Sequence, residues 1–149
     1  MDITDQEIDN LKSGRELDRL IAQHVFGLTL LTEAERNIIG EWESRRGYGG
    51  ATDTSALARD VQNQIRWISN YSTEIRAAFE IVELWLSVHA LVMTFRPGPK
   101  DWWVIFPDEC GHPEGSKDHG KNCFREAFGE TPELAICRAA LKMAMKKAT

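Results

Sequence analysis

The sequence predicts an α+β fold: a three-layer α/β/α sandwich on a small antiparallel three-stranded sheet, with a helical amino-terminal region. Two stretches, YSTEIRAAFEIVELWL and TPELAICRAALKMAMKK, each have a short polar start followed by an Ala-rich amphipathic pattern, which predicts a helix. Between them, residues 88–95, 102–106 and 124–128 have the apolar runs and alternation of β-strands. Residues 88–95 are apolar at nearly every position, which indicates a strand covered by helices on both faces.

Length and composition are those of an ordinary globular protein. The 149 residues predict a single domain, in which residues 1–70 form the helical region and residues 71–149 an α-β-β-β-α core. The acidic, polar start MDITDQEIDN excludes a secretory signal, and no apolar run reaches the roughly 18 residues of a membrane-spanning helix. The net charge of −5 disfavours nucleic-acid binding, which generally needs a basic surface. We therefore expect a cytoplasmic protein without membrane contact.

Four helices are expected in the amino-terminal region. Three of them begin at a capping box, in which a Ser or Thr is followed three residues later by Glu: Thr4 with Glu7, Ser13 with Glu16, and Thr32 with Glu35. The second helix should end at Gly27, since glycine accepts a left-handed cap, and the third should run up to the Gly-rich loop RRGYGG. A fourth helix is predicted over residues 56–68, because apolar residues recur there at helical spacing: Leu57, Val61, Ile65 and Ile68.

The remaining elements follow in order along the chain. Ser72 is the expected cap of a long helix, and residues 88–95 form the first strand. A turn at residues 96–101 leads to a second strand at 102–106, and a long polar loop separates it from a third at 124–128. Thr131 should cap the last helix, with Pro132 in its first position. Cys137 lies on the apolar stripe of this helix, so we expect it in the core.

Several of these segments resemble a known family. NYSTEIRAAFEIVE, the apolar hairpin with its WW start and ETPELAICRAALKMA are similar to the core of the phage ABA-sandwich domain, and LDRLIAQHVFG resembles the amino-terminal helix of that family. The resemblance implies a bacteriophage or prophage origin and an α/β/α sandwich, and it implies no reaction. Residues 28–66 depart from the family pattern as an enlarged helical insertion, and residues 107–122 as an enlarged loop.

The polar loop PDECGHPEGSKDHGKNC contains two cysteines and two histidines, the residue types that hold structural zinc. We predict a structural zinc site formed by Cys110, His112, His119 and Cys123. A metal would supply the packing that such a polar loop lacks. Alternatively, the four residues are unrelated members of a long hairpin loop. A catalytic zinc would also need a neighbouring acid or base, for which the loop offers Glu109, Glu114 and Asp118.

Two groups of residues are candidates for ligand binding. The first lies at the predicted hairpin, where aromatic rings and cations would suit a nucleotide-like ligand: Arg96, Lys100, Trp103 and Arg125, together with Trp102. The second is the RRGYGG loop, in which Arg45, Arg46 and Tyr48 could contact a ligand or partner. The alternatives are that one Trp is core, the arginines are solvated strand ends and the Gly-rich loop is a hinge.

These patterns contain no recognised catalytic motif. We expect a non-enzymatic phage accessory protein that acts by binding in the host cytoplasm, in counter-defence, by sequestering a nucleotide signal or blocking a host defence protein. A homodimer or higher homo-oligomer is expected, because the Trp-rich strands and Ala-rich helix could pair across a two-fold axis. The alternatives are a zinc-stabilised module that binds protein or nucleic acid, and a small hydrolase using a loop Cys/His pair, either Cys110 with His112 or Cys123 with His119.

Overall fold

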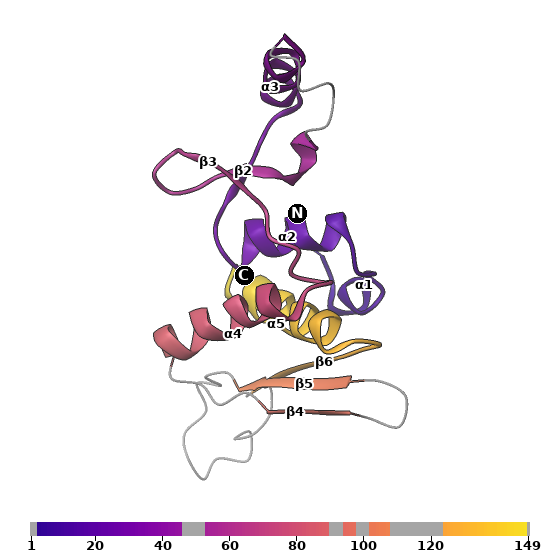
Figure 1. Cartoon of the computed structure of the whole chain (residues 1–149). Helices are drawn as coiled ribbons and strands as arrows, with labels where there is room; N and C mark the ends of the chain where they lie inside the picture. Colours follow the sequence, from indigo (N-terminus) through magenta and orange to yellow (C-terminus); the bar gives the residue numbers. More distant parts are fainter. Residues whose placement is uncertain (1–2, 46–52, 90–93, 98–101, 108–123, 149) are drawn as a thin grey trace.

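The computed structural model describes residues 3–45, 53–89, 94–97, 102–107 and 124–148 (Figure 1). Its helices are α1 (Asp5–Asp9), α2 (Arg15–His24), α3 (Glu33–Arg45), α4 (Ile75–His89) and α5 (Pro132–Ala148), with a short 3-10 helix η1 (Thr54–Ala56). One antiparallel sheet contains β1 (Thr29–Leu30), β2 (Leu57–Arg59) and β3 (Ile65–Trp67). A second contains β4 (Thr94–Pro97), β5 (Trp102–Pro107) and β6 (Phe124–Gly129). The predicted α+β class is confirmed.

Helix α5 lies at the centre of the fold and contacts α1, α2, α4, β5 and β6 (Figure 1). Its many alanines allow neighbours to approach from several sides, and nine of the fourteen residues from 132 to 145 are buried. The predicted core position of Cys137 is confirmed, since its side chain is fully buried. Burial raises the pKa of this thiol well above its usual value, which leaves it protonated and unreactive at neutral pH.

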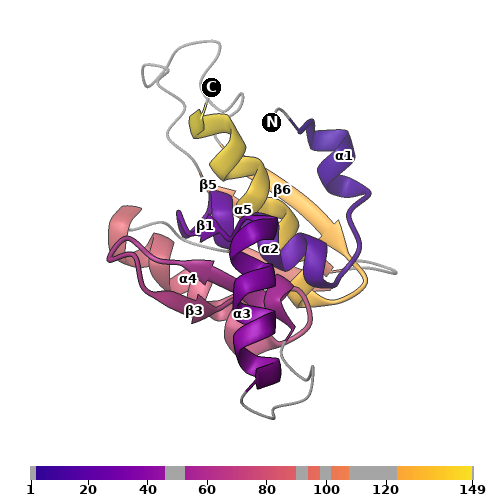
Figure 2. The same cartoon turned by 90° about the horizontal axis from the view of Figure 1, so that it is seen from above.

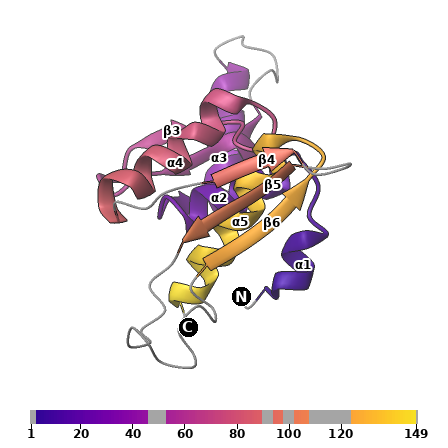
Figure 3. The same ribbon diagram turned by 90° about the horizontal axis from the view of Figure 1, so that it is seen from below.

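The β4–β5–β6 sheet packs on α5 through one face. Val104 and Phe106 of β5 and Ala127 of β6 are buried on this inner face, while the alternate residues point the other way. Figure 3 shows the strands in front of α5, with no helix drawn over the other face. A second helical layer on this sheet is therefore not formed by the residues that the structure describes, which differs from the expected three-layer sandwich. Helix α4 lies beside α5, whereas α2 and α3 lie on the far side of α5 from this sheet (Figure 1).

A single cluster of buried apolar side chains joins the two halves of the chain. It runs from Ile8 of α1 and Leu17 of α2 to Val104 of β5 and Met143 of α5. The β1–β2–β3 sheet and α3 lie at the end of the molecule opposite the β4–β5–β6 sheet (Figures 1 and 2). Within the described ranges, every helix is too short or too polar to cross a bilayer.

The predicted helix over residues 56–68 is wrong, because this segment forms η1 and the β2–β3 hairpin. Asp60 shapes the turn: its carboxylate accepts hydrogen bonds from the backbone N–H groups of Gln62 and Gln64, at 2.9 and 3.0 Å. Asn63 adopts a left-handed conformation with φ 63°, which Asn tolerates better than most residues. The apolar spacing was misleading, since Val61 lies at the hairpin tip with 92% of its surface exposed.

The predicted first strand, residues 88–95, is also wrong in its extent and position. Helix α4 continues to His89, β4 begins only at Thr94, and residues 90–93 lie outside the described residues. Moreover, β4 is an edge strand of its sheet. A continuous apolar run has no period that separates a two-faced strand from a buried helix, so the end of α4 was assigned to the sheet.

Helix starts follow the predicted caps in three cases. The hydroxyls of Thr4 and Thr32 each accept the backbone N–H of the Glu three residues later. The backbone N–H of each Thr in turn donates to the carboxylate of that Glu, which completes both capping boxes. The hydroxyl of Thr131 accepts the N–H of Leu134 at 3.2 Å. The caps predicted at Ser13 and Ser72 are wrong: α2 begins after Gly14, and α4 begins three residues after Ser72.

Ser72 instead joins the start of α2 to the segment before α4. Its hydroxyl accepts the N–H of Gly14 at 2.9 Å, and its own N–H donates to the Asp18 carboxylate at 2.8 Å. Asp18 and Ser72 are both buried, with 2% and 1% of their surfaces exposed. Burial raises the pKa of Asp18 above its ordinary value of 3.8, against the lowering effect of the Ser72 hydrogen bonds.

This raised pKa predicts a pH-dependent stability that Asp18→Asn should remove. A carboxyl group with a raised folded-state pKa stabilises the fold below the unfolded value of 3.8, and this contribution is lost as pH rises through the folded-state pKa. The Asn side chain keeps an oxygen for the Ser72 N–H, so we expect the variant to gain stability relative to the native chain as pH rises to neutrality. Urea unfolding at several pH values measures this. Asp18→Ala leaves the Ser72 N–H unsatisfied, so it should cost about 1–3 kcal/mol, and an equal effect of both variants would contradict the argument.

Candidate functional site

The outer face of the β4–β5–β6 sheet is the candidate binding surface, and it is defined by Trp103, Ile105, Glu126 and Phe128. Strand pairing places Trp103 opposite Phe128 and Ile105 opposite Glu126, on the side away from α5. The Trp103 and Phe128 rings are stacked, with centroids 6.0 Å apart and planes 8° from parallel. The Trp103 indole Nε1 donates to Glu126 Oε2 at 2.8 Å, which orients the indole and holds the carboxylate beside it.

Exposure on this face is greatest at its edge. Phe128 lies on edge strand β6, and 51% of its surface is exposed, while its neighbours Trp103, Ile105 and Glu126 are half-buried. An aromatic ring held by a neighbouring ring loses little conformational freedom when a partner covers it. The outer face therefore offers a preformed apolar contact with one carboxylate beside it.

Two of the residues predicted at the hairpin come together on the sheet. The β4–β5 register places Arg96 directly opposite Trp103. Arg125 is not brought to them: it pairs with Phe106, three positions further along β5, on the inner face of the sheet. Trp102 also belongs to the inner face, packed against the core, and Lys100 lies outside the described residues.

Sequence analysis missed Glu126 and Phe128 as site residues, although a signal was present. The alternation of Phe124, Glu126 and Phe128 predicted the third strand and placed Glu126 and Phe128 on one face. Only the register between β5 and β6 shows that this face is the one that carries Trp103.

The other predicted sites fall largely outside the described part of the chain. Arg45 is exposed at the last residue of α3, while Arg46 and Tyr48 are not among the described residues. The four predicted zinc ligands, Cys110, His112, His119 and Cys123, and the acids Glu109, Glu114 and Asp118, also lie outside them. Elsewhere, residues 3–45, 53–89, 94–97, 102–107 and 124–148 contain no cluster of three or more metal-ligating side chains. Zinc binding by the loop stays a prediction.

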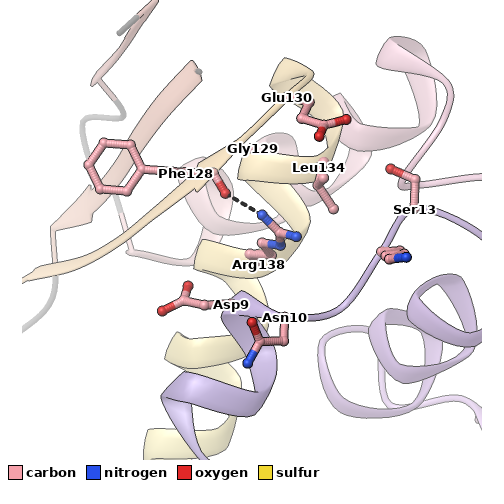
Figure 4. Close-up of a pocket in the computed structure, with 9 residues that line it drawn as sticks. Asp9, Asn10, Ser13, Phe128, Gly129, Glu130, Leu134 and Arg138 are labelled. Atoms are coloured by element: carbon pink, nitrogen blue, oxygen red, sulfur yellow. Dashed lines mark hydrogen bonds between the residues drawn. The ribbon is translucent and has the colours of Figure 1, made fainter. Parts of the chain in front are cut away.

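A pocket of about 600 Å³ lies between the α1–α2 connection and the turn from β6 to α5 (Figure 4). Asn10 and Ser13 line one side, and Glu130 and Leu134 line the other. Arg138 lies between them: its guanidinium donates to the Leu11 carbonyl at 2.6 and 3.0 Å and to the Phe128 carbonyl at 2.7 Å. Phe128 contributes its carbonyl here, whereas its ring points away from the pocket (Figure 4).

A second cation completes this junction. Lys142, with 8% of its surface exposed, donates to the Asp9 carboxylate at 2.7 Å and to the Glu126 carbonyl at 3.0 Å. Arg138 and Lys142 thus join α1 and its following loop to β6 and α5. Because their donors are directed at protein oxygens, the pocket is primarily a structural joint, and the outer sheet face remains the better candidate for binding.

Comparisons with known proteins agree with this architecture. Residues 19–141 match the sequence profile of the phage ABA sandwich domain. The fold is similar to that of a phage protein from Bacillus cereus ATCC 14579, whose crystal structure superposes with a TM-score of 0.54 at 18% sequence identity, covering 89% of this chain and 88% of that one. No curated protein matches the chain in sequence. The profile match extends over most of the chain, from α2 to α5, so the protein belongs to the phage ABA sandwich family.

Proposed function

We propose that the chain is a phage accessory protein that acts in counter-defence by binding a host defence protein through the outer face of its β4–β5–β6 sheet. The observation that carries the proposal is the Trp103–Phe128 stack, in which two large rings stand on a sheet face that no helix of the described residues covers, and Phe128 is half exposed. Aromatic and Arg residues dominate the energetics of protein interfaces, and Arg96 lies opposite Trp103 in register.

The surroundings of the stack favour a protein partner over a nucleotide signal. Small-molecule sites are concave, whereas the pocket at Arg138 opens on the other side of β6 from the Phe128 ring (Figure 4). In addition, the Glu126 carboxylate is held 2.8 Å from the Trp103 indole nitrogen. A phosphate of a nucleotide stacked on these rings would meet this negative charge, while a protein could offer it a hydrogen-bond donor.

The proposal can be tested by phage plating. The protein is expressed in bacterial strains that each carry one defence system, and each strain is infected with a phage that its system blocks. We expect plating to recover on at least one strain, and Phe128→Ala to abolish the recovery, because loss of an aromatic ring that anchors an interface costs about 2 kcal/mol or more, about 30-fold in affinity. Phe79→Ala is the matched control, since Phe79 of α4 is 37% exposed and does not belong to the outer face.

Two outcomes would contradict the proposal. If no strain recovers, or if Phe128→Ala and Phe79→Ala behave alike, the outer face is not the active surface. Titration calorimetry against cyclic nucleotide and ADP-ribose signals provides the second arm: binding heat that Phe128→Ala removes would assign the face to a nucleotide signal instead of a protein.

A further inference from the structure

Apolar side chains are also exposed at the opposite end of the molecule. Eight large apolar residues are exposed in the described part of the chain, and five of them lie between residues 29 and 67: Ile38, Trp42, Val61, Ile65 and Trp67. Ile38 and Trp42 are one turn apart on the same face of α3 and are 66% and 52% exposed. None of the thirteen residues of α3 is buried. Figure 2 shows α3 on the outside of the molecule.

The exposed apolar surface continues from α3 onto β3. Arg59 of β2 donates to the Glu35 carboxylate of α3 at 2.8 Å, which ties the first turn of α3 to the face of the sheet that carries Arg59. Strand pairing places Ile65 opposite Arg59, on this same face, and Trp67 follows two residues later. Ile65 and Trp67 are 44% and 59% exposed on an edge strand. Together, Ile38, Trp42, Ile65 and Trp67 form the α3–β3 surface.

The stability of α3 indicates which kind of partner covers this surface. A helix of thirteen residues is marginal in water unless an apolar face packs against something, and Gly40 weakens this one further by roughly 1 kcal/mol. Within the described chain, its main neighbour is the short helix η1. A second copy of the chain is available to cover this face whenever the protein is made.

We propose that the α3–β3 surface is the interface of a two-fold symmetric homodimer in which the two α3 helices pack antiparallel. With the axis at the level of Gly40, Ile38 of each copy meets Trp42 of the second copy. The charges fit this arrangement, because Glu35 in the first turn of α3 and Arg45 in its last lie on the same side of the helix as Ile38 and Trp42. Glu35 is bonded to Arg59 of its own copy, and its carboxylate can also face Arg45 of the second copy. Antiparallel packing brings the acidic end of each helix beside the basic end of the other, and it also aligns the two helix dipoles favourably.

Light scattering of the full chain on a size-exclusion column tests the proposal over a wide range of protein concentrations. We expect a mass of twice the 16.9 kDa of one chain. Ile38→Glu and Trp42→Lys should each reduce the mass to one chain, because a charge would then face an apolar side chain twice in each dimer. Asn37→Glu is the control: it adds the same negative charge as Ile38→Glu at a neighbouring exposed position of the helix, and it should leave the dimer intact.

Mixing the two variants gives the sharpest result. In a mixed dimer of I38E and W42K, one contact pairs the two introduced charges and the other restores the native Ile–Trp contact, so the mixture should recover the dimer mass. This recovery also shows that both variants are folded. The proposal is overturned if the native chain has the mass of one copy, if I38E remains dimeric, or if the mixture stays monomeric. Phe128→Ala should keep the dimer mass, which separates this test from that of the outer face.

Discussion

Replacing Gly129 with alanine should lower the free energy of unfolding by about 1–3 kcal/mol, and this cost comes from a backbone clash. Gly129 ends β6 where the chain turns into α5. A Cβ atom there would lie 2.6 Å from the backbone nitrogen of Ala135 and 3.1 Å from the Leu134 Cβ. Since the nearest atom belongs to the helix backbone, β6 or α5 must shift. Urea unfolding measures the loss, and thermal unfolding should show a lower midpoint, by about 2–4 °C for each kcal/mol.

Gly40→Ala is the matched control for this prediction. Gly40 lies in the interior of α3, and a Cβ atom built on it would have no neighbour within 4 Å. Alanine has the higher helix propensity, so this variant should be more stable by roughly 0.5–1 kcal/mol. Opposite signs at the two glycines are expected. A neutral Gly129→Ala would show that β6 and α5 do not approach as closely as the fold requires.

Replacing Arg138 with alanine should lower the free energy of unfolding by about 2–4 kcal/mol. Its guanidinium bridges the carbonyls of Leu11 and Phe128, which belong to segments far apart in the sequence. The substitution removes charged donors from both acceptors at once, and the segment that follows α1 loses a polar attachment to the sheet. Urea unfolding gives the total loss of stability. Hydrogen exchange, compared with the native chain, should accelerate more in α1 than in α4.

Two further variants define the role of Arg138. Arg138→Lys should recover only part of the loss, because one ammonium group cannot replace a planar fork that reaches two carbonyls. Arg76→Ala, at an exposed position of α4, should change stability by less than about 0.5 kcal/mol. If Arg138→Ala were as mild as Arg76→Ala, the bridge would contribute nothing measurable to the junction.

The candidate site could be predicted only in part. Trp103 and Arg96 were found as an aromatic ring and a cation close together in sequence, and the structure places them opposite each other. Arg125 was grouped with them in the sequence analysis. However, β6 pairs Arg125 with Phe106, so Arg125 belongs to the inner face of the sheet, whereas the next residue, Glu126, belongs to the outer face. Phe128 and Glu126 complete the outer face from a strand twenty residues away, so no local pattern could pair them with Trp103.

The junction around Arg138 was invisible in the sequence for a different reason. In the sequence, Arg138 is one of several cations near the end of a helix, where the macrodipole alone could explain it. Its bonds to Leu11 and Phe128 depend on where α1 packs, and Lys142 likewise finds Asp9 only after α1 has docked.

The sequence by itself determined the features that depend on a few consecutive residues. The capping boxes at Thr4 and Thr32, the start of α5 at Thr131, the buried Cys137 and the family relationship were all predicted from such local patterns. Only the tertiary structure decided where α4 ends, that residues 57–67 form a hairpin, and which strand faces share a surface. The physical reason is that an apolar residue is satisfied by any buried environment, helix or strand, and the choice between them depends on long-range packing and register.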